Sequence, residues 1–277
     1  MNKFEGSSKY IAGEELLNSV NVAMALQKPL LIKGEPGTGK TMLAEAIAES
    51  LGMELIIWSI KSTTKAQDGL YLYDTVQRLY DSQFGEGDVG DIKQYIRLGK
   101  LGEAFTSEKQ CVLLIDEIDK ADLEFPNDLL WELDKMEFYI NETKETIKTK
   151  TRPIVIITSN AEKELPDAFL RRCIFHYIEF PGKDKMTEIV HAHYGDIDKK
   201  LVEQAMEAFY SLRDMNELQK KPSTSELLDW IQALIISGVD IKKIVDEIPY
   251  VGVLLKKNED IEVMREIKEK GYSLKRW

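Results

Sequence analysis

The sequence predicts an α/β fold, in which helices cover a parallel β-sheet, followed by an all-helical region. Short, nearly continuous apolar runs alternate with amphipathic stretches along the first part of the chain, a pattern typical of buried parallel strands. After residue 181 the apolar residues recur only at helical spacing. We therefore expect one domain over residues 1–181 and a small helical domain over 182–277.

Composition narrows the classes of function. The chain has 277 residues, of which 43% are apolar, and a formal net charge of -11. A negative net charge of this size repels the phosphates of nucleic-acid backbones, which disfavours nucleic acid as a partner. No run of 18 apolar residues and no secretory leader is present, so we expect a cytoplasmic protein without a membrane span. Cys111 and Cys173 make no CxxC pattern and are interpreted as small core residues.

The predicted elements follow in order. We expect a helix over 14–26, a second helix that ends at Gly52, and a hairpin between Met136 and Thr151. Residues 62–110 are interpreted as an irregular insertion, with one helix near 74–83 and another around 95–105. Further helices are expected near 184–194, 197–213, 223–238 and 240–248. Buried strands are predicted in KPLLIKG, ELIIWSI, QCVLLIDEID, RPIVIITSN and IFHYIEF.

The stretch GEPGTGKT lies between the first predicted strand and a predicted helix, where a phosphate-binding loop is expected. Such a loop needs inward backbone N–H groups, glycines at tight bends, a helix N-terminus and one cation. Lys40 supplies the cation for the β and γ phosphates, and Thr41 offers a hydroxyl to Mg²⁺. A glycine turn with a solvated lysine is the alternative. The predicted nucleotide-binding residues of the loop are Gly34, Glu35, Pro36, Gly37, Thr38, Gly39, Lys40 and Thr41.

Two adjacent carboxylates follow the third predicted strand, in LLIDE. Burying such charges is costly unless they meet a metal ion or hydrogen-bond donors. We expect Asp116 to bind Mg²⁺ together with Thr41, and Glu117 to activate the attacking water. Two solvated acids at the start of a helix would be the ordinary alternative.

Three further residues are candidates for catalysis. Asn160 ends the fourth predicted strand, where its amide could orient water, although an Asn at a strand end is often a turn former. Arg171 and Arg172 precede the fifth strand, and one guanidinium could reach a neighbouring subunit's γ phosphate. A surface pair of arginines in salt bridges is the alternative.

Taken together, these motifs resemble those of AAA+ ATPases of the MoxR family. GEPGTGKT resembles the Walker A motif, LLIDEIDKA the Walker B motif, and ITSN the sensor 1 strand. LPDAFLRRCIFHYIEFP is similar to the segment that carries the arginine finger, with Arg172 the closer match and Arg171 the second candidate. The resemblance covers nearly the whole chain.

This resemblance implies an αβα nucleotide-binding domain with a P-loop, an insertion within about 62–95 and a hairpin within about 138–150. It implies a helical lid after that domain, and ATP and Mg²⁺ as cofactors. It also implies hexameric rings with ATP between subunits, and a von Willebrand factor A domain protein as partner in the maturation of a client. One departure is that the sensor 2 arginine of many relatives is absent, where this chain reads KKPSTSELLDW with Lys220 and Lys221 nearby.

The resulting hypothesis is an ATP hydrolase that remodels a protein client. A nucleic-acid-translocating motor and a nucleotide-dependent scaffold or switch remain as alternatives at this point.

Overall fold

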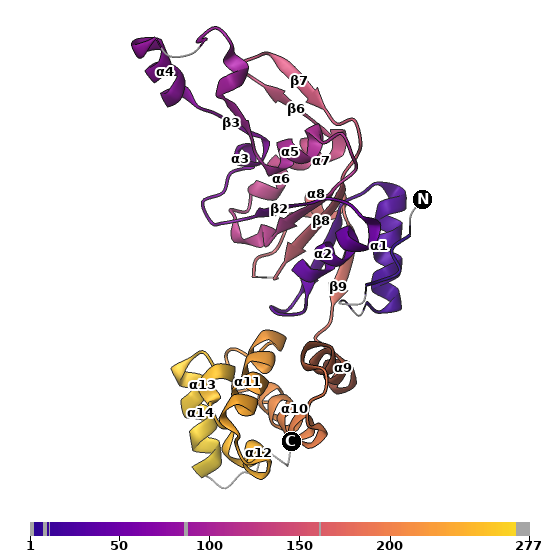
Figure 1. Cartoon of the computed structure of the whole chain (residues 1–277), viewed down its shortest axis with the longest axis vertical. Helices are drawn as coiled ribbons and strands as arrows, with labels where there is room; N and C mark the ends of the chain where they lie inside the picture. The colour runs from indigo at the N-terminus through magenta and orange to yellow at the C-terminus, as the bar shows by residue number, and fades with distance from the viewer. Residues whose placement is uncertain (1–2, 8–9, 11, 86–87, 161, 270–277) are drawn as a thin grey trace. The chain divides into compact units, whose positions relative to one another are not determined.

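The computed structural model describes residues 3–7, 10, 12–85, 88–160 and 162–269 (Figure 1). Two compact units are present. The first holds the chain up to Ile178 apart from Glu35–Thr38, and the second holds Glu35–Thr38 with the chain from Glu179 onward. The domain boundary that we expect from the sequence lies just beyond this division.

The first unit contains the predicted α/β fold. Its sheet has five parallel strands in the order β2-β5-β8-β1-β9. All five predicted strands are confirmed, with the bounds β1 Leu30–Gly34, β2 Leu55–Ser59, β5 Val112–Asp116, β8 Ile154–Ser159 and β9 Ile174–Ile178.

Alternate residues of the central strands enter two different cores. Leu114 and Ile156 belong to the core on one face of the sheet, whereas Leu113 and Ile157 belong to the core on the other. Side chains in a strand alternate between faces, so a strand buried on both faces must be apolar at every position. The edge strands β2 and β9 differ from the prediction because their burial alternates.

Helices cover both faces. The first core is enclosed by α1 (Glu14–Leu26) and α2 (Lys40–Leu51), and α2 ends at Gly52 as predicted. Gly52 has a φ of 64°, the left-handed conformation that commonly ends helices. Short helices cover the other face: α3 Ala66–Leu70, α5 Lys100–Thr106, α6 Phe125–Asp128, α7 Leu130–Lys135 and α8 Asp167–Leu170.

The insertion contains an unpredicted hairpin. Strand β3 (Tyr71–Tyr73) pairs antiparallel with β4 (Ile96–Leu98), and between them lie α4 (Thr75–Phe84) and a short 3-10 helix, η1 (Ile92–Tyr95). The helix near 74–83 is confirmed. The helix expected around 95–105 is wrong in its first half, because residues 96–98 pair with β3 as strand β4 and the helix there, α5, begins only at Lys100.

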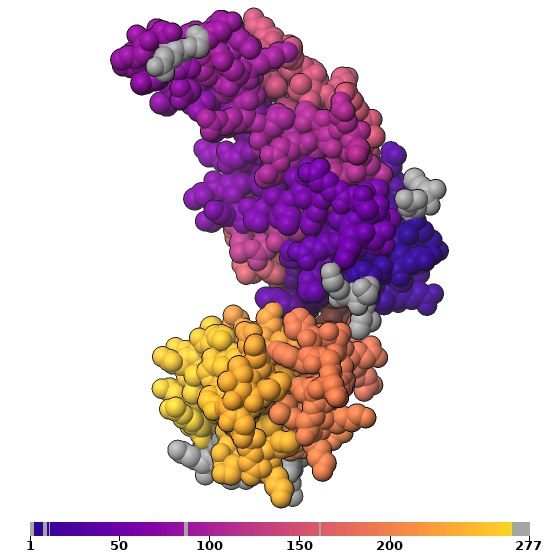
Figure 2. All heavy atoms as spheres, in the orientation of Figure 1, coloured from indigo at the N-terminus to yellow at the C-terminus, as the bar shows by residue number. Residues whose placement is uncertain are grey.

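The predicted hairpin is confirmed and packs against the insertion. Strands β6 (Glu137–Ile140) and β7 (Glu145–Lys148) pair antiparallel. The backbone N–H of Asn141 in their turn donates to the Tyr71 hydroxyl at 3.0 Å, and the Tyr71 and Phe138 rings stack. The insertion and the hairpin therefore lie together at one end of the first unit (Figure 2).

The second unit is helical and has its own core. Its helices α9 (Lys183–Tyr194), α10 (Lys199–Arg213) and α11 (Thr224–Ser237) confirm three predictions, and the expected helix over 240–248 is a 3-10 turn followed by α12 (Ile244–Glu247). Two helices were not predicted, α13 (Val251–Leu254) and α14 (Asn258–Glu269). None of the helices in the described ranges is long and apolar enough to cross a membrane.

The two cysteines are free thiols in apolar surroundings. Cys111 is buried in the core, and Cys173 packs against it. Burial raises the pKa of the Cys173 thiol to about 12 and that of the Cys111 thiol above its ordinary value. Both are therefore protonated and unreactive at neutral pH, consistent with the role as core residues that we predicted.

Candidate functional site

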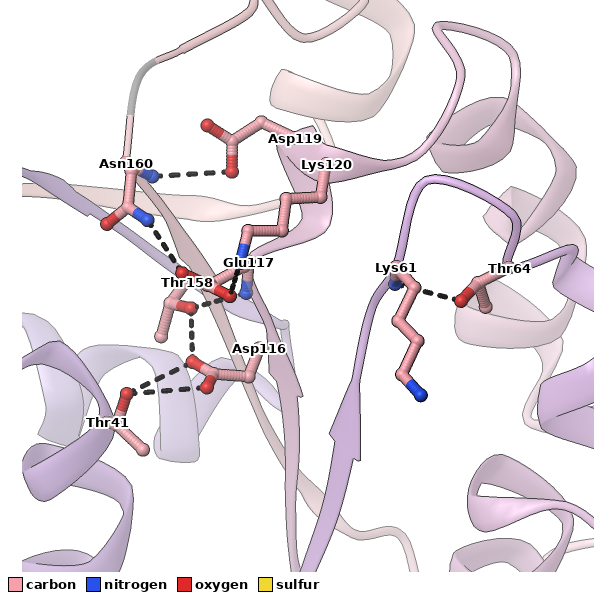
Figure 3. Close-up of polar contacts among 9 residues, drawn as sticks. All are labelled: Thr41, Lys61, Thr64, Asp116, Glu117, Asp119, Lys120, Thr158 and Asn160. Atoms are coloured by element: carbon pink, nitrogen blue, oxygen red, sulfur yellow. Dashed lines mark hydrogen bonds and ion pairs between the residues drawn. The ribbon is translucent and has the colours of Figure 1, made fainter.

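Four of the predicted site residues lie together at one edge of the sheet: Thr41, Asp116, Glu117 and Asn160 (Figure 3). Strands β1, β5 and β8 are neighbours and parallel, so their carboxyl ends lie side by side. The glycine loop follows β1, Asp116 ends β5, and Asn160 follows β8. Ligands of open α/β sheets bind beyond these ends.

The glycine loop has the backbone that its sequence predicts. Gly37 and Gly39 have φ angles of 77° and 82°, which L side chains rarely adopt. A Cβ atom on Gly39 would also lie 3.3 Å from the ring of Tyr10. Helix α2 begins at Lys40 directly after these bends, so its N-terminal N–H groups and partial positive charge lie at the loop.

Lys40 is buried, and its ammonium group donates to the Gly34 carbonyl at 2.9 Å. A lysine is rarely buried unless its charge has partners. The Gly34 carbonyl, at the start of the glycine loop, holds the Lys40 ammonium group against that loop. This places a cation where the pattern predicts one.

Thr41 and Asp116 are in direct contact. The Thr41 hydroxyl donates to the two Asp116 carboxylate oxygens at 3.1 and 3.4 Å. Mg²⁺ is usually held by one or two such oxygen groups together with waters and substrate phosphates, rather than by an all-protein cage. The described residues contain no group of three or more His, Cys, Asp or Glu that could hold a metal ion. This pair therefore fits the phosphate-assisted kind of magnesium site.

Glu117 has an unusual backbone conformation, with a φ of 59° and a ψ of 50°. For a residue other than glycine this left-handed conformation costs about 1–2 kcal/mol. The Glu117 backbone N–H donates to the Thr158 hydroxyl at 2.8 Å, and that hydroxyl donates to Asp116 at 2.7 Å. Strained residues of this kind persist where the surroundings hold them, and they cluster at active sites.

The Glu117 carboxylate is held by two donors. The Asn160 side-chain amide donates to one oxygen at 2.9 Å, and the Lys120 ammonium forms an ion pair with the other. The hydrogen bond from Lys120 to Glu117 is the main reason why the pKa of Lys120 is raised. Asn160 and Glu117 thus lie within hydrogen-bonding reach, as candidates for one reaction should.

Asp119 orders the chain that follows β8. Its carboxylate is buried and accepts the backbone N–H groups of Asn160, at 3.3 Å, and Glu162, at 2.9 Å. A buried carboxylate requires such donors. Asp119 therefore fixes the backbone from which the Asn160 side chain projects.

In the second unit, Arg213 is buried beside residues of the glycine loop that belong to this unit. Its guanidinium pairs with the Glu35 carboxylate at 2.6 Å and donates to the Pro222 carbonyl at 2.6 Å. Lys220 and Lys221 line a pocket with Glu35 and Pro36. Although the KKPSTSELLDW stretch contains no arginine, Arg213 of α10 donates a hydrogen bond to Pro222 within it.

Arg171 and Arg172 follow α8 and precede β9. Arg172 donates from Nε to Asp134 at 2.7 Å and from a terminal nitrogen to the Ala168 carbonyl at 2.8 Å. Arg171 is exposed. The structure thus places the pair on the surface, with Arg172 bound to a carboxylate, and its described hydrogen bonds do not reach Asp116 or Glu117.

Sequence reasoning missed four residues of these networks: Thr158, Asp119, Lys120 and Arg213. A Thr two positions before Asn160 is an ordinary strand residue in sequence, because strands favour β-branched side chains. Asp119 and Lys120 offered a weak signal, since they directly follow the predicted carboxylate pair. Arg213 gave no such signal in the sequence, because it is the last residue of a long amphipathic helix.

Comparison with known proteins gives the family. Residues 30–181, more than half of the chain, match the family described as "ATPase family associated with various cellular activities (AAA)". The chain belongs to this AAA family. The part of the chain over residues 30–181 is accordingly an ATPase domain of the AAA+ type, whose cofactors are ATP and Mg²⁺.

Two further proteins are similar to the chain, one in sequence and one in structure. It is 27% identical over 191 residues to midasin of Dictyostelium discoideum, an alignment that covers 66% of this chain and 3% of midasin. The Holliday junction branch migration motor RuvB of Thermotoga maritima has a similar structure, with a TM-score of 0.55 and 15% identity over 94% of this chain and 77% of that one. At this identity the likeness shows the AAA+ fold alone.

We predict that Asp119→Ala lowers the free energy of unfolding by about 1–3 kcal/mol, because two backbone N–H groups lose their buried acceptor. Urea denaturation would measure the change. Asp122→Ala is the matched control, since the Asp122 side chain is exposed three residues further along. Equal stability of the two variants would show that Asp119 does not hold this segment.

Proposed function

We propose that this chain is a MoxR-type AAA+ ATPase that uses Mg²⁺-dependent ATP hydrolysis to remodel, or help mature, a protein client. The observation that carries this proposal is the hydrogen-bonded group at the carboxyl ends of β1, β5 and β8. It joins Thr41, Asp116, Glu117 and Asn160 through contacts of 3.1 Å or less, with Thr158 as the link between them.

The roles that we assign follow from the positions of these groups. Lys40 and the N–H groups of the glycine loop bind the β and γ phosphates, while Thr41 and Asp116 hold Mg²⁺. Bound Mg²⁺ would neutralise charge on the phosphate oxygens. Glu117 accepts the proton of the attacking water, and Asn160 orients the Glu117 carboxylate and that water.

An exposed apolar surface supports a protein client. No residue of α4 is buried, and Asp81 on α4 accepts a hydrogen bond from the Tyr95 hydroxyl of the insertion at 2.9 Å. A polar residue of α4 thus contacts the rest of the insertion, while the apolar residues of α4 are exposed. A cluster of exposed apolar side chains marks an interaction site. We define the α4 surface as Leu72, Val76, Leu79, Tyr80 and Phe84, which are all more than one third exposed.

The MoxR assignment rests on the sequence resemblance and on two features that it implies. The insertion and the β6–β7 hairpin occur where MoxR-type proteins carry theirs, and they contact each other through Tyr71. We therefore propose a ring, most simply a hexamer, in the cytoplasm, with a von Willebrand factor A domain protein as partner. A gene for such a protein beside that of this chain would support this assignment.

Two alternatives make different predictions. A nucleic-acid motor would bind DNA or RNA with an affinity that falls steeply between low and high salt, which filter binding would reveal. The net charge of this chain, -11, disfavours the nucleic-acid motor. A nucleotide-dependent scaffold would capture and release its partner on ATP binding alone, without the Glu117 carboxylate.

We expect Glu117→Gln to bind ATP with near-normal affinity while phosphate release falls about 10²–10⁴-fold, because the amide cannot accept a proton. Glu124→Gln, an exposed neighbour, serves as the control. Near-normal turnover in Glu117→Gln would remove the proposed base.

A second prediction tests whether Arg172 acts on a neighbouring subunit. Lys40→Ala and Arg172→Ala chains should each be nearly inactive alone, and mixed rings should regain activity. In such rings an Arg172→Ala subunit keeps its own loop and receives the arginine of its Lys40→Ala neighbour. Arg171→Ala in place of Arg172→Ala identifies which arginine is used. Mixtures as inactive as their components would contradict a role in trans.

For the α4 surface we predict that the triple change Val76→Ser, Leu79→Ser and Phe84→Ser leaves basal ATP hydrolysis unchanged. Binding of the von Willebrand factor A domain protein should be lost, because apolar contacts carry the affinity. Val22→Ser on α1 is the matched control, since Val22 is also exposed. Isothermal titration calorimetry gives the affinities, and unchanged binding by the triple variant would exclude this surface.

A further inference from the structure

Thr158 lies at the centre of the site although it is neither a nucleotide ligand nor a base in the roles assigned above. It is fully buried on β8. Strands β5 and β8 pair in register from Val112↔Ile154 to Ile115↔Ile157, so the next pair along the sheet is Asp116 and Thr158. Their side chains therefore face the same side of the sheet.

That side is the one that α2 covers. Leu114 and Ile156, two residues before Asp116 and Thr158, belong to the core shared with α2. Side chains two residues apart in a strand share a face, so Asp116 and Thr158 face α2, where Thr41 lies in its first turn. Figure 3 shows Thr158 and Thr41 on either side of the Asp116 carboxylate.

The Thr158 hydroxyl both accepts and donates a hydrogen bond. It accepts the Glu117 N–H at 2.8 Å, and its single proton is directed at Asp116 Oδ1 at 2.7 Å. Successive hydrogen bonds of this kind polarise and strengthen one another. The same group thus sets the orientation of the Asp116 carboxylate and holds the left-handed backbone of Glu117.

We propose that Thr158 is a positioning residue for ATP hydrolysis, which couples the orientation of the magnesium-binding carboxylate to that of the catalytic base. This inference rests on the proposed roles of Asp116 and Glu117. Groups that orient metal ligands typically matter about 10–100-fold for metal affinity or activity, although they touch neither metal nor substrate. The coupling means that one hydroxyl determines both where the cation binds and from where the proton is accepted.

The alternative is that Thr158 only fills the core. The Thr158 methyl group could pack there, and its hydroxyl would then be satisfied without consequence for the reaction. Substitutions at this position separate the two readings, because Thr158→Val keeps the shape and loses the hydroxyl, whereas Thr158→Ser keeps the hydroxyl and loses the methyl group.

The test compares Thr158→Val, Thr158→Ser and Ile156→Val with the wild-type chain. Ile156→Val is the control for lost packing, because Ile156 is buried on the same face two residues earlier. Two quantities are measured: the Mg²⁺ concentration that gives half of the magnesium-dependent gain in affinity for a fluorescent, non-hydrolysable ATP analogue, and kcat and KM for ATP.

We expect Thr158→Val to raise the half-saturating Mg²⁺ concentration about tenfold or more and to lower kcat about 10–100-fold. Affinity for the analogue in EDTA should stay unchanged, as the glycine loop is intact. Thr158→Ser should behave as the wild type. A Thr158→Val variant that matches Ile156→Val in both measurements would overturn the proposal.

If Thr158→Val does not fold, as judged by circular dichroism, then the pair Thr158→Ser and Thr158→Ala isolates the hydroxyl at similar side-chain volume. Loss of magnesium dependence in the Ala variant alone supports the proposal, and equal behaviour of the two overturns it. Failure of the wild-type chain to bind the analogue or to hydrolyse ATP would instead contradict the proposed function. The two failures are therefore distinguishable.

Discussion

The parallel pairing of β5 with β8 is the constraint on which the rest of the site depends. Their register places Asp116 beside Thr158, and it brings Glu117 within reach of Asn160. The register is fixed by apolar residues that enter two cores on opposite faces of the sheet. A slip of one residue would exchange the two faces and move Asp116 away from α2, so hydrophobic burial and site geometry are the same constraint here.

Hydrogen bonds link the ends of β5 and β8 in both directions. Thr158 on β8 holds the end of β5, while Asp119 after β5 holds the chain that follows β8. Two sets of hydrogen bonds thus join the segments that follow β5 and β8. Lys120 adds an ion pair to the Glu117 carboxylate, so each oxygen of the proposed base has one donor. Each carboxylate oxygen has a second lone pair, which could accept a hydrogen bond from an attacking water.

Much of the fold could be predicted because burial on both faces leaves a plain signal in β1, β5 and β8. The glycine loop was predictable for a similar reason, since Gly37 and Gly39 adopt φ angles that other residues avoid. The β3–β4 hairpin was not, because three-residue strands leave too few positions to separate a period of 2 from one of 3.6. Thr158 and Asp119 act through partners about 40 residues away, which no local pattern encodes.

The most direct measurement is the affinity of the purified chain for ATP by isothermal titration calorimetry, with Mg²⁺ and with EDTA. The account predicts binding of ATP that Mg²⁺ strengthens, and loss of that binding in Lys40→Ala. No affinity for any nucleoside triphosphate in the presence of Mg²⁺ would contradict it.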